Sequence, residues 1–166
     1  AALIAHDVRG GEVVVEEAAH LYNAEGGGLS AVAGAVARPV RGRDGILAPA
    51  DIEPALRGTN DAALAPTRLV CIENTHNAAG GTVTTPAALA GLREVAARRG
   101  VPVHMDGARL YNAAAYLRVP IADLCRHVDS VWFALCKGLG APVGAVLAGD
   151  APFMAKARRA AKMLGG

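Results

Sequence analysis

Apolar runs of strand length alternate with longer stretches of helical periodicity along this chain. The run from Arg68 to Glu73 is nearly continuous in apolar residues, as expected for a strand that is buried on both faces of a sheet. Thr85-Pro86 then opens an Ala/Leu-rich segment that ends at Arg98-Arg99-Gly100, and these residues supply the cap, first-turn proline and terminal glycine of a helix. A second apolar run follows at 101–105. A helix between two apolar strands predicts a right-handed crossover in a parallel sheet.

The same alternation continues on both sides of this unit. Further strands are expected at 12–16, 130–135 and 144–149, and further helices from about residue 29 and over about 152–164. Residues 41–66 are polar and rich in turn residues around one short helix at 50–56, which predicts a surface segment. The pattern therefore predicts an α/β fold in one domain, with a mostly parallel sheet sandwiched by helices.

The composition limits the classes of function. The formal net charge of +2 comes from 17 basic and 15 acidic residues spread along the chain, so no patch for nucleic acid or an anionic membrane is indicated. The three cysteines lack C-x-x-C spacing, which favours a reducing compartment over a disulfide framework or a metal site. No membrane span and no signal peptide are seen, so we expect a cytoplasmic protein. The ends, Ala1 and Gly166, suggest a fragment of a longer chain.

Polar residues gather where the predicted strands end. Glu73-Asn-Thr-His-Asn77 follows the strand at 68–72, Asp106 and Arg109 follow the strand at 101–105, and Lys137 follows the strand at 130–135. In open α/β sheets, ligands bind outside the carboxyl ends of the strands. The polar side chains that follow these three strands are therefore expected to lie together at one edge of the sheet.

Lys137 and Asp106 together predict a site for pyridoxal 5'-phosphate (PLP). Lys137 lies between an apolar strand and a Gly-Leu-Gly-Ala-Pro turn, where partial burial would favour the free amine that forms an imine with the cofactor's aldehyde. Asp106 could cap the following helix, but paired with Lys137 it would hold the pyridine nitrogen protonated. No cluster of histidines or cysteines indicates a metal.

Three further side chains have both a functional and a structural interpretation. Arg109 could be a helix-start charge, but its planar fork suits a carboxylate or the cofactor's ring oxygen. His20 could be an ordinary exposed histidine or could stack on the cofactor ring. His76 could be structural or could relay a proton to a substrate hydroxyl. The glycines in Glu25-Gly-Gly-Gly28 indicate close packing or a turn rather than a phosphate loop.

With these residues in view, the chain resembles the low-specificity L-threonine aldolases, which are PLP enzymes of the aspartate-aminotransferase fold (fold type I) within the β-eliminating lyase group. The resemblance covers nearly the whole chain and rests on an ordered set of four motifs. The motifs are Ala19-His-Leu-Tyr22 with Glu25 and its glycines, Glu73-Asn-Thr-His-Asn77 with Gly80-Gly81, His104-Met-Asp-Gly-Ala-Arg109, and Lys137-Gly-Leu-Gly-Ala-Pro-Val-Gly144.

The resemblance implies a role for each site residue. Lys137 would be the Schiff-base lysine, Asp106 would bind the pyridine nitrogen and His20 would stack on the ring. Arg109 would contact the cofactor or the substrate carboxylate, and His76 would lie near the substrate's β-hydroxyl. The implied reaction is retro-aldol cleavage of L-threonine or L-allo-threonine to glycine and acetaldehyde, a step in threonine catabolism and glycine biosynthesis.

The resemblance also bounds what this chain contains. Residues 1–166 would be the central part of the PLP-binding large domain, without the family's phosphate-gripping loop and C-terminal small domain, in a homodimer or homotetramer. The chain carries Cys136 where the family commonly has serine before the lysine. Two alternatives stay open: another fold type I enzyme, namely a β-eliminating lyase, racemase or aminotransferase, and an inactive truncated domain.

Overall fold

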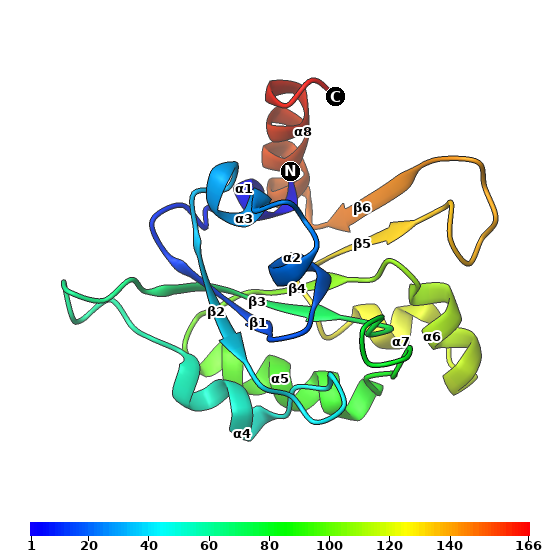
Figure 1. Cartoon of the computed structure of the whole chain (residues 1–166), viewed down its shortest axis with the longest axis horizontal. Coiled ribbons are helices and arrows are strands. Elements are labelled where there is room, and N and C mark those ends of the chain that lie inside the picture. Colours follow the sequence, from blue (N-terminus) through cyan, green and yellow to red (C-terminus); the bar gives the residue numbers. More distant parts are fainter.

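The computed structural model describes all 166 residues as one sheet covered on both faces by helices (Figure 1). The strand order is β2-β1-β3-β4-β5-β6. The first five strands in this order pair in parallel, and only β6 runs antiparallel to its neighbour β5. The strands are β1 (Glu12–Glu16), β2 (Val36–Val40), β3 (Thr67–Glu73), β4 (Val103–Asp106), β5 (Ser130–Ala134) and β6 (Ala145–Gly149). The expected α/β architecture with a mostly parallel sheet is confirmed.

The helices form two layers, with α4 to α7 below the sheet and α1 to α3 and α8 above it in the view of Figure 1. No helix is long and apolar enough to cross a lipid bilayer. The helices are α1 (Ala2–Ala5), α2 (His20–Asn23), α3 (Gly28–Ala31), α4 (Pro49–Ile52), α5 (Pro86–Arg98), α6 (Leu110–Leu117), α7 (Ile121–Cys125) and α8 (Ala151–Met163), with a 3-10 turn, η1 (Glu53–Ala55), after α4.

Alternate residues of the central strands enter two separate cores. Val14 and Val70 belong to the larger core, which α4 to α7 cover, whereas their neighbours Val13 and Leu69 belong to the smaller one beneath α3. All four of these side chains are buried, so the strands are apolar on both faces. This two-sided burial explains why the runs are nearly continuous in apolar residues.

The crossover helix α5 forms as its end signals predict. The Thr85 hydroxyl accepts a hydrogen bond from the Ala88 N–H at 3.3 Å, and Pro86 occupies the first turn. Leu89, Leu92 and Val95 are buried along one face at helical spacing. The flanking strands β3 and β4 pair in parallel, which confirms the predicted crossover between parallel strands.

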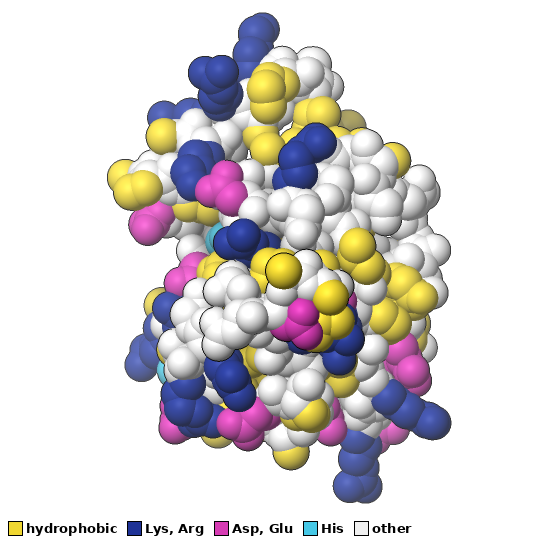
Figure 2. Space-filling model, turned by 90° about the vertical axis from the view of Figure 1, so that its left-hand side faces the viewer, with side chains coloured by type: hydrophobic (Ala, Val, Ile, Leu, Met, Phe, Trp, Pro, Cys, Tyr) yellow, Lys and Arg dark blue, Asp and Glu magenta, His cyan; other side chains and the backbone are white.

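Other expectations need correction. The helix expected from residue 29 is the single turn α3, and β2, α1, α2 and α7 were not predicted. The helix α6 was anticipated only as the one that follows Asp106, without bounds. The Gly-rich segment is a turn, because Gly26 and Gly27 have φ of +56° and +75°, but its glycines are not closely packed. Basic and acidic side chains are interspersed on the face shown in Figure 2, in keeping with the near-neutral composition.

Candidate active site

The candidate site is built on a row of three side chains that crosses the carboxyl ends of β3, β4 and β5. Glu73 pairs in register with Asp106, and Asp106 pairs with Trp132. Side chains at paired positions of parallel strands stand on the same face of the sheet, so the three lie side by side. Asp106 is the middle residue of the row. On one side of it Glu73 is hydrogen-bonded to His20, and on the other side the Trp132 ring faces Lys137.

Glu73 holds His20 on one side of Asp106. One Glu73 oxygen accepts the backbone N–H of His20 at 2.7 Å, and the other lies 3.0 Å from His20 Nδ1 and 2.9 Å from the backbone N of Asn77. Burial raises the pKa of Glu73, but these hydrogen bonds from Asn77 and His20 outweigh it and hold the pKa below its usual value. An ionised carboxylate only accepts hydrogen bonds, so the His20 ring carries its proton on Nδ1 and leaves Nε2 free.

Asp106 is buried at the end of β4, with 8% of its surface exposed. Burial raises its pKa to about 6, with a further upward contribution from the charge of Glu73 and downward contributions from the Ala108 N–H, Lys137 and His20. The Ala108 N–H donates to Oδ1 at 3.1 Å, and no group of the chain donates to Oδ2. Asp106 and Trp132 line a cavity of about 400 Å³ between the sheet and helices α1 and α3.

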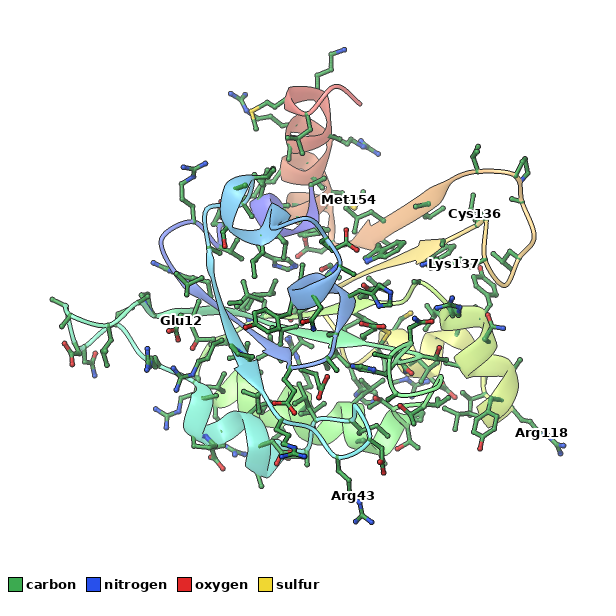
Figure 3. The ribbon with its side chains drawn as sticks, in the orientation of Figure 1. Glu12, Arg43, Arg118, Cys136, Lys137 and Met154 are labelled. Atoms are coloured by element: carbon green, nitrogen blue, oxygen red, sulfur yellow. The ribbon has the colours of Figure 1, made fainter.

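Lys137 lies in the loop between β5 and β6, just past the carboxyl end of β5 (Figure 3). Its Nζ lies 5.7 Å from the centre of the Trp132 ring, within the range of a cation–π contact. Both Lys137 and the neighbouring Cys136 are exposed, so the partial burial expected for the lysine is not provided by these 166 residues. The Lys137 charge is nevertheless close enough to Asp106 to lower the pKa of that carboxyl.

Arg109 stands at the start of α6, three residues after Asp106. Its side chain is half-buried and makes no hydrogen bond or ion pair within the chain. A half-buried guanidinium without a carboxylate partner is free to bind an anionic group of a ligand.

His76 lies at the same carboxyl edge, because β1 and β3 are parallel, but its ring pairs with Glu16 and not with a member of the row. It is 1% exposed, and its Nε2 lies 2.9 Å from Glu16 Oε2 at the end of β1. The backbone N–H of Ala79 donates to His76 Nδ1 at 3.3 Å, so neither ring nitrogen is free in the tautomer that donates to Glu16. Gly45 covers the ring, since a Cβ at that position would lie 2.6 Å from His76 Cγ. The surroundings of His76 favour a supporting role over contact with a substrate.

Sequence reasoning assigned no role to three residues that organise this site: Glu73, Glu16 and Trp132. Glu73 and Glu16 are charged residues at the ends of otherwise apolar strands, and that position was the available signal. Both are buried, at 6% and 4% exposed, and the carboxylate of each contacts a histidine ring. A carboxylate buried to this extent needs a hydrogen-bonding partner.

Comparison with known proteins agrees with this arrangement. The family model described as "Beta-eliminating lyase" matches residues 1–166. Low-specificity L-threonine aldolase 1 of Arabidopsis thaliana is 42% identical over 162 residues, which are 96% of this chain and 45% of that protein. The alanine racemase TOXG of Cochliobolus carbonum is 35% identical over 155 residues, 93% of this chain and 39% of the relative.

Among solved structures, the threonine aldolase of Leishmania major superposes with a TM-score of 0.85 at 28% identity, covering 98% of this chain and 48% of that one. The expected fold, that of the large domain of fold type I enzymes, is confirmed by this match. The chain spans about half the length of the curated threonine aldolases it matches. With its whole length covered by the family model and its site built from the four motifs, the chain belongs to the β-eliminating lyase family.

Proposed function

We propose that this chain is the central part of a PLP-dependent aldolase that cleaves L-threonine or L-allo-threonine to glycine and acetaldehyde. The row of Glu73, Asp106 and Trp132 carries the proposal, because it places His20 and Lys137 on either side of one buried carboxylate. The substrate class is supported by the names of relatives in two kingdoms of life. Since the chain spans about half of these relatives, the phosphate loop and the small domain are assigned to the rest of the protein.

The residues present fit the cofactor. Asp106 offers an oxygen without a donor in the chain, and a carboxylate whose pKa is raised by burial gains most from a cationic partner such as a pyridinium. The fixed ring of His20 offers a flat face for stacking. The Lys137 amine is exposed, as imine formation requires, and its charge is close enough to Asp106 to lower the pKa of that carboxyl.

PLP, when bound, would supply the electron sink for the carbanion that remains after the Cα–Cβ bond breaks. The chain's own residues would bind the cofactor and the substrate and orient them. Arg109 would pair with the substrate carboxylate or the cofactor, because its guanidinium has no partner in the chain. His20, with Nδ1 fixed on Glu73, has Nε2 available to hold a proton beside the reacting atoms. His76 would stabilise the carboxyl end of β1 through its hydrogen bond with Glu16.

The test is to incubate the full-length protein with PLP, reduce with borohydride and locate the phosphopyridoxyl group by peptide mass spectrometry. We expect the label on Lys137, and we expect Lys137→Ala to lose both the label and the aldolase activity. Lys162→Ala, at an exposed lysine in the last turn of α8, is the matched control. A label on another residue, or aldolase activity retained in Lys137→Ala, would overturn the assignment.

A racemase is the second candidate, because TOXG is 35% identical to this chain. Product analysis separates the two reactions. An aldolase releases acetaldehyde and glycine from threonine, whereas a racemase converts L-alanine to D-alanine without carbon–carbon cleavage. Acetaldehyde release without alanine racemisation is the expected result.

The resemblance further leads us to propose a cytoplasmic homodimer or homotetramer. Sedimentation equilibrium of the full-length protein tests the assembly, and a monomer at micromolar concentration would contradict it.

A further inference from the structure

The loop that carries Lys137 is contacted from outside by one side chain of α6. An ideal Cβ built on Gly138 would lie 2.0 Å from Asn112 Oδ1, so this oxygen sits against the Cα–H of Gly138, the residue after the lysine. Contacts of this Cα–H···O kind recur where two elements approach closely. Residues 136–140 are all exposed, so the loop has little burial of its own to fix its position.

The start of α6 and the segment that leads into it both contact β5, the strand from which the loop emerges. The Gly107 N–H donates to the Trp132 carbonyl at 2.9 Å, and the rings of Tyr111 and Phe133 meet edge to face at 5.3 Å. Asn112 follows Tyr111 directly, and its exposed side chain places the amide oxygen against Gly138. Arg109, three residues after Asp106, is the N-cap of the same helix.

From this geometry we propose that Asn112 is a positioning residue for Lys137, which sets the place of the lysine loop relative to Asp106. The lysine is then held from two directions. Trp132 lies under its Nζ, at 5.7 Å from the ring centre, and Asn112 stops the loop at Gly138 from the α6 side. The proposal rests on the proposed function, because the lysine must be placed only if it binds the cofactor.

The contact with Asn112 also accounts for the glycine at position 138. Its φ is not in the left-handed region, so the backbone alone does not require glycine there. A methyl group, however, would overlap the Asn112 oxygen. Gly138→Ala should therefore force either the Asn112 side chain or the loop to move, and removing the Asn112 side chain as well should relieve that overlap.

The experiment compares Asn112→Ala, Asn112→Asp and the control Tyr116→Ala in the full-length protein. Tyr116 lies on the same helix and is 76% exposed. Two quantities are measured: amide hydrogen exchange of residues 136–141 without cofactor, and the rate at which limiting PLP is trapped on Lys137 by borohydride. Asn112→Ala should speed exchange in the loop and slow trapping by about threefold to tenfold. Asn112→Asp keeps an oxygen in place and should stay within about twofold of wild type.

Four outcomes decide between these possibilities. Unchanged loop exchange and trapping in Asn112→Ala would overturn the positioning role, as would a Tyr116→Ala effect of equal size. Non-additivity is the supporting signature: Gly138→Ala should disturb the loop more alone than together with Asn112→Ala. If wild type traps no PLP on Lys137, the proposed function fails, and the exchange data still show whether Asn112 holds the loop.

Discussion

Replacing Asp106 by asparagine is expected to stabilise the cofactor-free protein while abolishing tight binding of PLP. The carboxyl is 8% exposed, and burial is the main cause that raises its pKa from 3.8 to about 6. An ionised Asp106 is thus a cost to the folded state unless a cation lies beside it. Asparagine has nearly the same shape and carries no charge, so the substitution isolates this cost.

The magnitude follows from the pKa. The difference between 3.8 and about 6 is roughly two pH units, which corresponds to about 3 kcal/mol at ~1.4 kcal/mol per unit. Because the folded-state pKa is raised, the native protein holds this proton while the unfolded chain releases it, so stability falls as pH rises from about 4 to about 6. Above about pH 6 the carboxyl is ionised in both the folded and the unfolded protein, so the full destabilisation applies. Asp106→Asn should therefore gain about 2–3 kcal/mol relative to wild type at pH 7.5, and close to nothing at pH 4.

Urea unfolding of the two cofactor-free proteins at pH 4 and pH 7.5 measures this directly. Glu17→Gln, at a half-exposed carboxylate paired with Arg41, is the control and should show no such pH-dependent gain. A difference between wild type and Asp106→Asn that is the same at both pH values would refute the reasoning. In the PLP-trapping assay the same variant should lose at least about tenfold in labelling of Lys137, because the pyridinium has lost its counter-charge.

Two further substitutions test the supports of the site. Glu73→Gln retains only one acceptor oxygen for the three hydrogen bonds the carboxylate now receives, so the ring of His20 should lose its orientation. PLP affinity measured by absorbance titration should fall about tenfold, whereas Glu94→Gln on the surface of α5 should leave it unchanged. Gly45→Ala combines a φ of +75° with a Cβ placed 2.6 Å from a buried ring and should cost about 2–4 kcal/mol in urea unfolding. Gly80→Ala, at φ +79° with open space around it, should cost only about 1 kcal/mol, and equal losses would show that the ring contact is unimportant.

The parts of the fold that were predictable are those with two-sided burial. Strands β1 and β3 are apolar on both faces, and α5 carries its own start and stop signals, so local sequence was sufficient. Strand β2 was missed because it lies at the edge of the sheet, has no fully buried residue and contains Pro39. The helices α2 and α3 are single turns, too short for any periodicity to be seen.

The predictable parts of the site are those that depend on position along a strand. Asp106 and Lys137 could be placed at one edge because each follows an apolar run. The residues that hold the site could not be found in this way, since the neighbours of Asp106 are fixed by the pairing register of three strands. The burial of His76 against Glu16 likewise depends on a contact between residues 60 positions apart.

The pair of carboxylates at the centre of the row shows why that register matters for function. Glu73 and Asp106 are neighbours in the sheet, yet hydrogen bonds from Asn77 and His20 hold the pKa of one below its usual value while burial raises that of the other to about 6. Adjacent groups whose pKa values are driven apart have different tasks. Glu73 stays charged and fixes a histidine. Asp106 has only the Ala108 N–H as a donor, so it becomes a stable anion when a cation joins it, which is the property that a partner for a pyridinium nitrogen requires.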